Sequence, residues 1–577
     1  MQIRHILLII FLSLFVGIKA QENYPRNDFR SPLDIPLYLA GTFGEPRNTH
    51  FHAGLDIKTQ GVEGKNIYAI GDGYISRIKV SAWGYGNTIY ITHTNGYTSV
   101  YAHLKSFNEE ITAFVEANQM AQTKYEVNLD SLSSDIFPLK KGTKIALSGN
   151  TGGSHGPHLH FEIRDSLERP INPMLFGFDI RVQDDVKPGL YSFVLYNLTD
   201  AQQLTNSKRI NLNSKNKNLT KNNGTYTLSN IIKVNKDAIG FGINTTDKFT
   251  DVHNHNGVYD IKMYLDGEML YHYQMNRFSF DNDRDVLSHC DYWLKRNNNL
   301  TVHKCFIEPG NKLNTYNYLI NNGYAYLYDN EVHAVKIEVS DFHKNKSTLK
   351  FKIQKDETST IFKEKEYDFL DVLLQGRTNH FKNEDIEVIL PEDALYDHLY
   401  FKVKKETKTT ISDAFHIGDV KIPSFSYFDV KIKVKEIQEH LKEKYLIVLK
   451  NYKGYVKSLG GVFNDENRTI TAKSKAFGEY YIAIDTIPPK IRTLSVTEGK
   501  SMTKYKEFQF KITDNLSGID EYNCFINGNW VILGLDGKKS LYSYKIDENI
   551  VKGSNNILLI VKDKRNNAST FSAGFTY

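Results

Sequence analysis

The sequence predicts a mainly β protein: a small antiparallel β-sheet domain with a helical insertion, followed by several Ig-like β-sandwich domains. Short apolar runs alternate with Gly-rich turns from about residue 48 to residue 172, which is typical of short strands. After Arg181 the chain continues as short segments rich in Tyr, Phe, Ile, Val and Lys. With 577 residues it is too long for a single hydrophobic core, so we expect three or four domains.

Residues 1–20 have the pattern of an export signal peptide. Arg4 is positively charged, residues 6–18 form an apolar run, and Ala20 is a small residue suited to cleavage before Gln21. The run is too short to cross a bilayer as a stable helix, and no later segment is long enough. An uncleaved membrane anchor is the alternative interpretation. We expect an exported protein of the periplasm or the extracellular cell envelope, without a stable transmembrane segment.

The next clear element is a β-hairpin in "TIYITHTNGYTSVYAHL", residues 88–104. If Asn95-Gly96 is a two-residue turn, alternation divides the side chains between two faces. The apolar face then carries Ile89, Ile91, Val100, Ala102 and Leu104, and the polar face carries Tyr90, Thr92, Ser99, Tyr101 and His103. On this register His103 points away from the core.

The β pattern is interrupted between Phe107 and Pro138. Within it, Ile111, Phe114, Val115 and Asn118 recur at helical spacing. We predict a helix inserted beside the sheet, either as a wall of a groove or as a surface excursion.

The segment "HLHFEIR", residues 158–164, predicts a strand with one apolar and one polar face. Alternation places Leu159, Phe161 and Ile163 on the first face, and His158, His160, Glu162 and Arg164 on the second. The two imidazoles of that polar face can approach the same small volume.

Two later parts of the chain resemble each other. "DDVKPGL" from Asp184 parallels "DTIPPKI" from Asp485, and "DFHKNKST" from Asp341 parallels "DKRNNAST" from Asp563. Between these motifs, Gly257 and Gly518 are each followed ten residues later by the glycine of a turn. This order predicts a duplicated sandwich whose first copy has longer loops. We predict a signal peptide at 1–20, a β-sheet domain at 21–183, Ig-like sandwiches at 184–355 and 485–577, and a β-rich domain at 356–484, expected to be a sandwich.

Composition limits the classes of function. A net charge of +5 and a pI near 8.6 suit anionic surfaces such as cell-wall polymers, but are too weak to predict nucleic-acid binding. The three cysteines, Cys290, Cys305 and Cys524, cannot form a disulfide framework, and at most Cys290 and Cys305 pair. Their number also excludes a zinc site made of cysteines.

The chemistry-bearing residues are histidines and one aspartate. His52 and Asp56 lie four residues apart in "HFHAGLDI", a spacing that puts both on one side of a helix or a strand. Together with either His158 or His160 they provide two imidazoles and one carboxylate, which suits Zn²⁺ with an open position for water. Spacing does not decide between those two histidines. The remaining one and His103 are then free for proton transfer.

Other catalytic patterns are absent from the sequence. "GNTGGSHG" lacks the spacing of a phosphate-binding loop, and neither H-E-x-x-H nor G-x-S-x-G occurs. We assign no ligand role to His50, His93 or His155, and expect His93 to be a hydrogen-bonded structural histidine.

Taken in order, H-x-x-x-D, "YAHL" and "GPHLHFE" resemble the lysostaphin/LytM-type zinc metallopeptidases. The resemblance covers residues 41–173, about a quarter of the chain, with the helical insertion as its main departure. It implies a small antiparallel β domain with a narrow groove, and peptidoglycan cross-links as substrates. By the same resemblance Zn²⁺ is held by His52, Asp56 and His160, while His103 and His158 flank the bound water and act in catalysis.

The resulting expectation is an exported zinc endopeptidase that hydrolyses peptide cross-links of peptidoglycan, with sandwiches for targeting or positioning. One alternative is a non-catalytic cell-wall scaffold or hydrolase activator, against which the completely filled motif argues. Another is a peptidase of a different, glycine-rich protein substrate. The expected partners are peptidoglycan or its stem peptides, and cell-envelope proteins through the sandwiches; nucleic acid is not expected.

Overall fold

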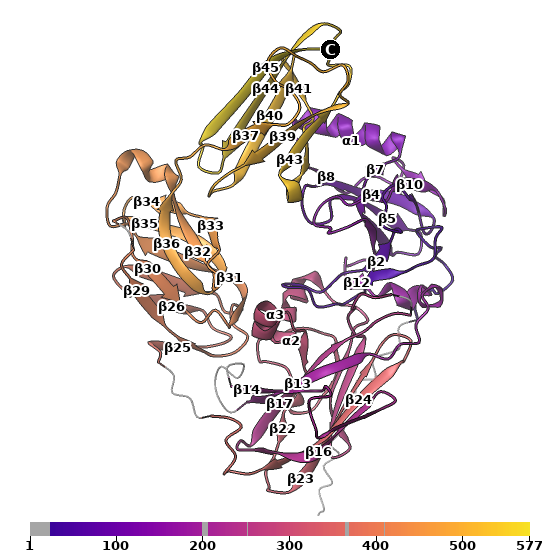
Figure 1. The fold of residues 1–577 in the computed structure, drawn as a ribbon, viewed down its shortest axis with the longest axis vertical. Helices are drawn as coiled ribbons and strands as arrows, with labels where there is room; N and C mark the ends of the chain where they lie inside the picture. Colours follow the sequence, from indigo (N-terminus) through magenta and orange to yellow (C-terminus); the bar gives the residue numbers. More distant parts are fainter. Residues whose placement is uncertain (1–22, 199–205, 251, 364–367, 409) are drawn as a thin grey trace, which may run out of the picture.

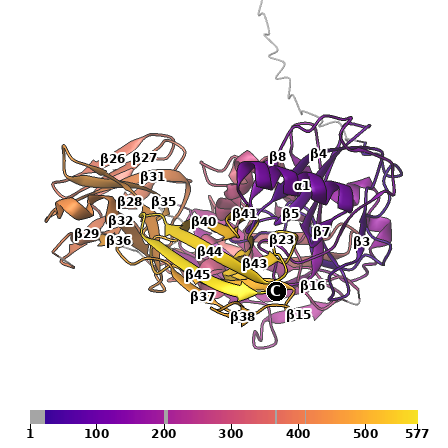
Figure 2. The ribbon, with the colours of Figure 1, turned by 90° about the horizontal axis from the view of Figure 1, so that it is seen from above.

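The computed structural model describes residues 23–198, 206–250, 252–363, 368–408 and 410–577. The predicted signal peptide, residues 1–20, lies outside the described residues. Four β-rich parts follow one another around a ring, and the last part returns to the first (Figures 1 and 2). None of the helices in the described part of the chain has the length and hydrophobicity that crossing a membrane requires.

The N-terminal domain contains a nine-stranded sheet and a three-stranded sheet. The main sheet has the order β1-β2-β11-β6-β5-β4-β8, with β12 beside β11 and β9 beside β4, and the small sheet has the order β3-β10-β7. The elements are β1 (Leu39–Gly41), β2 (Leu55–Lys58), β3 (Asn66–Tyr68), β4 (Gly73–Val80), β5 (Asn87–His93), β6 (Thr98–Leu104), β7 (Ser106–Phe107), α1 (Glu109–Gln122), β8 (Val127–Leu129), β9 (Pro138–Leu139), β10 (Lys144–Leu147), β11 (His158–Arg164), β12 (Pro170–Ile171), η1 (Pro173–Phe176) and η2 (Asp179–Arg181). As predicted, Leu159, Phe161 and Ile163 of β11 are fully buried in the core.

The predicted hairpin forms from β5 and β6, but its register differs by one residue from the prediction. Ile89 pairs with Tyr101, and the loop contains three residues, 94–96, in place of the two-residue Asn95-Gly96 turn. Gly96 has a φ of 84°, as the last residue of a three-residue hairpin loop requires. Tyr101 is therefore fully buried beside Ile89, and its assignment to the polar face was wrong.

The predicted helical insertion is confirmed as α1. Its N-cap is Asn108, whose side chain accepts a hydrogen bond from the N–H of Ile111. Ile111 and Val115 are buried against the sheet, whereas Asn118 is half-buried and donates to the carbonyl of Phe114. The helix ends at Thr123, which adopts a left-handed conformation.

The parts that follow η2 and that end the chain are sandwiches with matching strand orders. In the first, β16-β24-β23-β18-β19 form the core of a seven-stranded sheet, and in the last, β38-β45-β44-β40-β41 form a sheet. Both sheets contain one parallel pair, β16 with β24 and β38 with β45, at the same place in the order. The topology thus supports the predicted duplication.

The first sandwich carries the longer loops and two short helices. Its elements are β13 (Gly189–Asn197), β14 (Ser207–Asn211), β15 (Leu219–Asn222), β16 (Thr225–Val234), β17 (Ala238–Thr246), β18 (Asp260–Leu265), β19 (Glu268–Gln274), η4 (Phe280–Asp285), α2 (Val286–His289), α3 (Tyr292–Asn298), β20 (Val302–Lys304), β21 (Tyr316–Leu319), η5 (Asn321–Gly323), β22 (Ala325–Tyr326), β23 (Val332–Ser340) and β24 (Lys346–Lys355). Its second sheet has the order β14-β13-β17-β20, with β22 beside β17.

The last sandwich is smaller. Its elements are β37 (Lys490–Thr493), β38 (Lys500–Ser501), β39 (Glu507–Thr513), β40 (Ile519–Ile526), β41 (Asn529–Val531), β42 (Gly534–Asp536), η7 (Gly537–Lys539), β43 (Leu541–Lys545), β44 (Ser554–Asp563) and β45 (Ala568–Thr576). Its second sheet has the order β37-β39-β43-β42.

The middle part is also a sandwich, with two five-stranded sheets around a core of its own. The sheets have the orders β26-β27-β31-β35-β34 and β29-β30-β36-β32-β33, and β25 pairs with β28. The elements are β25 (Asp371–Leu373), β26 (Asn379–Lys382), β27 (Ile386–Leu390), β28 (Leu399–Phe401), β29 (Val403–Glu406), β30 (Ala414–Ile417), β31 (Pro423–Lys433), η6 (Glu439–Lys444), β32 (Tyr445–Lys450), β33 (Val456–Gly460), β34 (Val462–Asn464), β35 (Thr469–Ala476) and β36 (Gly478–Ile484). All three cysteines are buried free thiols, so Cys290 and Cys305 do not pair.

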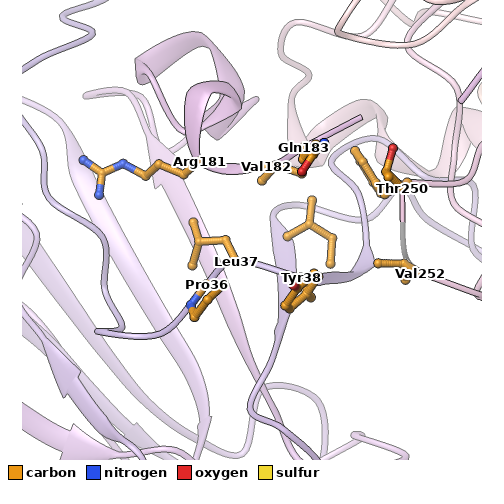
Figure 3. A pocket seen from close by; sticks show the side chains of 10 residues that line it. Pro36, Leu37, Tyr38, Arg181, Val182, Gln183, Thr250 and Val252 are labelled. Atoms are coloured by element: carbon orange, nitrogen blue, oxygen red, sulfur yellow. The ribbon is translucent and has the colours of Figure 1, made fainter. Parts of the chain in front are cut away.

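The N-terminal domain and the first sandwich share one hydrophobic core. Phe43 and Phe51 pack their rings on Phe278, at 5.4 and 5.7 Å between centroids. The two parts also enclose a cavity of about 160 Å³ between residues 36–39, residues 181–183 and the loop at Phe249 (Figure 3). The two parts are therefore packed together as one body around this junction.

Contacts of the last sandwich with the N-terminal domain close the ring. The ammonium group of Lys538 donates hydrogen bonds to the carbonyl oxygens of Asn150 and Ser154, at 2.5 and 2.8 Å. A Cβ placed on Gly537 would lie 2.6 Å from the ring of Trp83 and 2.9 Å from the carbonyl oxygen of Ala82, so Gly537 lies directly against the loop after β4. The Lys538 contact falls on the loop that precedes β11, close to the histidines described next.

Candidate metal centre

Three of the predicted site residues lie together at the start of β11. His52 lies on the loop before β2, Asp56 lies in β2, and His160 of β11 is its direct cross-strand partner. Nε2 of His52 lies 2.9 Å from Oδ1 of Asp56 and 3.0 Å from Nδ1 of His160, and that Nδ1 lies 2.9 Å from the same Oδ1. The three side chains are largely buried, so their lone pairs converge on one small volume.

The other nitrogen of each of these two histidines is held by the protein. Nδ1–H of His52 donates to the carbonyl of Thr42 at 2.7 Å, and Nε2–H of His160 donates to Oε1 of Glu162 at 2.8 Å. Nε2 of His52 and Nδ1 of His160 thus face Asp56: without a metal they can donate to its carboxylate, and once deprotonated they are free to ligate a metal. Histidines that ligate metals have this arrangement, because the outer bond fixes the tautomer and orients the ring.

The electrostatics of the site keep its carboxylates ionised. Burial raises the pKa of Asp56, but the charge of His52 and hydrogen bonds from His158 and His160 hold it well below its usual range. Glu162 is fully buried, yet the Arg164 guanidinium and His160 lower its pKa to about 2. Both residues are therefore anionic at neutral pH.

The carboxylate of Glu162 accepts hydrogen bonds from two further residues. Arg164 donates from Nε to Oε2 of Glu162 at 2.7 Å, and Tyr85 donates from its hydroxyl to Oε1. The Tyr85 ring also stacks on His160, at 5.1 Å between centroids. His160 is thus fixed by a carboxylate that is itself fully hydrogen-bonded.

The two predicted catalytic histidines lie beside the cluster. Nδ1–H of His103 donates to the carbonyl of Thr151 at 2.8 Å, and Nδ1–H of His158 donates to that of Gly156 at 2.8 Å. The rings of His103 and His158 are 4.8 Å apart, and Nε2 of His158 lies 3.4 Å from Oδ1 of Asp56. Both rings are therefore held through Nδ1, and Nε2 of His158 lies next to Asp56.

A β-bulge in β6 aims His103 at the site. Asn87 pairs with Leu104 while Ile89 pairs with Tyr101, so two residues of β6 oppose one residue of β5. His103 has a φ of 59°, in the left-handed region that non-glycine residues rarely adopt. Without this bulge, simple alternation from the observed register would turn His103 to the face of the buried Tyr101.

Some residues at the site were not predicted from the sequence. Arg47 donates to Oδ2 of Asp56 at 3.1 Å, and Tyr85 and the carbonyl of Thr42 hold the two metal-facing histidines. Glu162 was placed on the correct face but given no role. Strand alternation could have suggested Glu162, whereas no local pattern marks Arg47 or Tyr85.

The histidines without an assigned role do not belong to the ligand cluster. His93 is buried and hydrogen-bonds through Nε2 to Ser99 and through Nδ1 to the carbonyl of Asp72. His50 and His155 are exposed. The interpretation of His93 as a structural histidine agrees with these contacts.

The donor set fits zinc. His52, Asp56 and His160 offer two imidazole nitrogens and one carboxylate oxygen, which is the composition of catalytic zinc sites that keep a position for water. The outer hydrogen bonds to Thr42 and Glu162 complete that pattern. His158 and His160 differ here, since Nδ1 of His160 lies with His52 and Asp56, whereas Nε2 of His158 lies farther from Asp56.

Comparisons with known proteins find a family match within this domain. Residues 50–126 match the model of peptidase family M23, and residues 371–485 match that of the Zu5-like domain. An uncharacterized metalloprotease of Haemophilus influenzae is 32% identical over 123 residues, covering 21% of this chain and 20% of the relative. The DD-carboxypeptidase/endopeptidase Mpg of Neisseria meningitidis is also 32% identical over 123 residues, covering 21% and 22%.

A third relative is the peptidoglycan DD-endopeptidase ShyB of Vibrio cholerae, which is 31% identical over 161 residues, 27% of this chain and 32% of the relative. The matches thus span a third or less of the length of these relatives. The segment matched by the family model, residues 50–126, carries His52, Asp56 and His103 of the histidine cluster. This segment of the chain is therefore similar to peptidase family M23.

Proposed function

We propose that this protein is an exported zinc-dependent endopeptidase that hydrolyses peptide cross-links of peptidoglycan. The observation that carries the proposal is the convergence of His52, Asp56 and His160, with His103 and His158 beside them. The name of the Vibrio cholerae relative supports peptidoglycan as the substrate. Export rests on the predicted signal peptide at residues 1–20.

In this proposal His52, Asp56 and His160 hold the metal through Nε2, Oδ1 and Nδ1. Zinc bound there supplies Lewis acidity, which lowers the pKa of a water molecule and polarises the scissile carbonyl. Arg47 and Glu162 keep Asp56 and His160 in place through their hydrogen bonds. The protein thus supplies a fixed ligand set and leaves one side of it open to His103 and His158.

His103 and His158 handle the proton. Burial and the charges of His160 and His158 lower the pKa of His103 to about 3, so its imidazole is neutral at neutral pH. A neutral ring accepts the proton of the attacking water at Nε2 and then delivers it to the leaving amine. The rings of His103 and His158 both donate from Nδ1–H to backbone carbonyls. Either ring can therefore transfer the proton through its Nε2 atom.

We propose that the bond cleaved is the peptide bridge and not the glycan, as the family resemblance implies. In a source with direct cross-links, this is the bond between D-alanine and the diamino acid. The sandwiches then position the enzyme on the cell wall or on envelope proteins.

Digestion of purified sacculi tests this function. The zinc-loaded protein should release uncrosslinked stem peptides while sugar chains stay intact, as read by mass spectrometry, and the Asp56→Ala variant should release none. New reducing sugar ends would contradict peptide cleavage. Unchanged cross-linking by a zinc-loaded protein would instead favour the non-catalytic scaffold or activator, and cleavage of glycine-rich proteins alone would favour a different substrate.

A further inference from the structure

A second cluster of metal-ligating side chains lies at the junction between the N-terminal domain and the first sandwich. We call it the junction cluster, and it consists of Asp184, Asp247, Asp341 and His343. Asp184 precedes β13, Asp247 follows β17, and the other two lie in the turn between β23 and β24. Three loops of the sandwich thus bring their carboxylates together at the end that receives the linker from η2.

The carboxylates of the junction cluster are buried and incompletely bonded. Asp184, Asp247 and Asp341 are 6%, 2% and 4% exposed. Oδ1 of Asp184 accepts from the N–H of Val186 and Oδ1 of Asp341 accepts from that of Asn345. Yet no described residue donates a hydrogen bond to Oδ2 of Asp184, Oδ2 of Asp341 or Oδ1 of Asp247.

Such oxygens are costly to bury as charges without a cation. Burial and repulsion between the carboxylates raise the pKa of Asp184 to about 7 and that of Asp247 to about 9, so without a cation Asp247 is protonated at neutral pH, and a cation would bind in place of its proton. Asp247 and Asp341 also line a cavity of about 30 Å³, which is large enough for a water molecule or an ion.

His343 is oriented as a metal ligand would be. Its Nε2–H donates to the carbonyl of Asp179 at 3.2 Å, in η2 of the N-terminal domain. This bond leaves Nδ1 as an acceptor, and within the described residues that nitrogen is buried and has no hydrogen-bond partner. It lies 3.8 Å from Oδ2 of Asp184, whose side chain is fully buried. Histidines that ligate metals have this arrangement: one ring nitrogen donates to a backbone carbonyl, and the second ring nitrogen faces the metal site.

The duplicated sandwich shows what occupies the same place in the other copy. There, Asp485, Asp514 and Asp563 correspond to Asp184, Asp247 and Asp341, by sequence motif and by position next to equivalent strands. Two residues after Asp563 stands Arg565, where the first copy has His343.

In that second copy a permanently charged residue, Arg565, lies near two of these carboxylates. Its guanidinium interacts electrostatically with Asp485 and Asp563, and it donates to the carbonyl of Gly461 in the preceding domain at 3.1 Å. His343 likewise donates a hydrogen bond to the preceding domain. The first copy therefore has the carboxylates of this site but no arginine beside them.

We propose that Asp184, Asp341 and His343, assisted by Asp247, bind a divalent transition-metal ion, Zn²⁺ or Mn²⁺, which fastens the first sandwich to the end of the N-terminal domain. The ligand atoms of Asp184, Asp341 and His343 lie within 4.8 Å of one another. Two carboxylates and one imidazole suit these ions, whereas Ca²⁺ prefers six to eight oxygen ligands.

The test uses the full-length chain in a His52→Ala background, so that the metal of the catalytic site does not contribute. After removal of metal, incubation with Zn²⁺ and gel filtration, this variant should retain about one zinc ion per chain by elemental analysis. The His52→Ala/His343→Arg variant should retain none, and should still fold because arginine stands at this position in the second copy. As a control, His52→Ala/His380→Arg, which changes an exposed histidine of the middle sandwich, should retain the ion.

Thermal unfolding provides a second measurement that does not depend on the arginine variant. Zn²⁺ should raise the melting temperature of the His52→Ala protein, because a ligand that binds the folded state stabilises it. A His52→Ala protein with no retained zinc and no such shift would overturn the proposal. Equal zinc content with and without His343→Arg, or retention of Ca²⁺ in preference to both Zn²⁺ and Mn²⁺, would overturn it as well. The readout is independent of peptidase activity.

Discussion

At the scale of single residues, the site depends on Asp56, whose Oδ1 lies within 3.4 Å of nitrogens from three histidines. Two of these nitrogens belong to His52 and His160, whose other ring nitrogens bond to Thr42 and Glu162. The third belongs to His158, which is held by the loop before β11. Single substitutions can therefore test which of these residues bind the metal and which transfer the proton.

Alanine at His52, Asp56 or His160 should remove the catalytic zinc, because a three-ligand site does not survive the loss of one ligand. His103→Ala and His158→Ala should keep that zinc and lose turnover by about 10²-fold or more. Elemental analysis and a soluble muropeptide assay measure both quantities, and His155→Ala, at an exposed neighbour, serves as the control. If His158→Ala lost the catalytic zinc while His160→Ala kept it, His158 would be the metal ligand and His160 the proton carrier.

The acid stability of the protein should depend on Glu162. Its pKa in the folded protein is about 2, below its ordinary value of 4.5, so its contribution is present above the unfolded pKa and is lost as pH falls toward 2. In metal-free protein, Glu162→Gln should reduce the free energy of unfolding at neutral pH by on the order of 3 kcal/mol. This deficit should shrink below about pH 4.

Urea unfolding over a series of pH values measures this dependence. Glu168→Gln is the matched control, since Glu168 also bonds Arg164 but is largely exposed. It should change the unfolding free energy by less than about 1 kcal/mol. A deficit for Glu162→Gln that did not change with pH would show that lost packing, and not the charge, causes it.

At the scale of elements, the bulge in β6 determines where His103 points. His103→Val should be less stable than His103→Ala by about 1–2 kcal/mol, because the left-handed conformation is costly for a β-branched residue. Both variants lose the hydrogen bond to Thr151, so their difference isolates the backbone cost. His103→Asn should be at least as stable as the alanine variant. Valine and alanine variants of equal stability in urea unfolding would show that the bulge is absent.

The hairpin of β5 and β6 also shows a limit of prediction from the sequence. In β11 the alternation of side chains correctly separated Leu159 and Phe161 from His160 and Glu162, because the strand is regular and one face packs in the core. In β5 and β6 the identical rule placed Tyr101 on the wrong face. Asn95-Gly96 fits both a two-residue and a three-residue loop, and this choice shifts every pair.

Contacts between residues far apart in the sequence could not be predicted from local sequence patterns either. Arg47 and Tyr85 reach the site because loops from different parts of the chain meet there, and neither has a repeating spacing that would mark it. The helix at α1 could be predicted, since its apolar spacing is a local property. The repeated Asp motifs were visible in the sequence, but their burial and missing partners emerged from the fold.

At the scale of the whole molecule, the continuous core changes what a truncated chain should do. If the domain predicted at residues 21–183 were independent, a chain ending near Arg181 would fold alone. That cut would expose Phe43 and Phe51, which pack on Phe278, and each such ring stabilises by about 1.5–3 kcal/mol when buried. A chain ending after Lys355, the last residue of β24, keeps both contacts and should fold with higher stability.

Urea unfolding of the two truncated chains, followed at the N-terminal domain, measures this difference. The chain ending after Arg181 should unfold at a lower urea concentration, and the longer one should bind zinc at the catalytic site as the full chain does. Equal midpoints and equal slopes for the two chains would show that the shared core adds nothing to this domain.

The middle and last sandwiches should increase the rate of cleavage of intact sacculi more than that of small soluble substrates. A chain ending after Lys355 should cleave sacculi more slowly than the full chain, because a second binding contact raises the effective concentration of the enzyme at its substrate. Loss of the last sandwich also removes the bonds from Lys538 to Asn150 and Ser154, so full-length Lys538→Ala is the control for that contact. We expect Lys538→Ala to retain full binding to sacculi, and the truncated chain to lose it in a pull-down assay. If both proteins cleave sacculi and soluble muropeptides as the full chain does, the sandwiches have no targeting role.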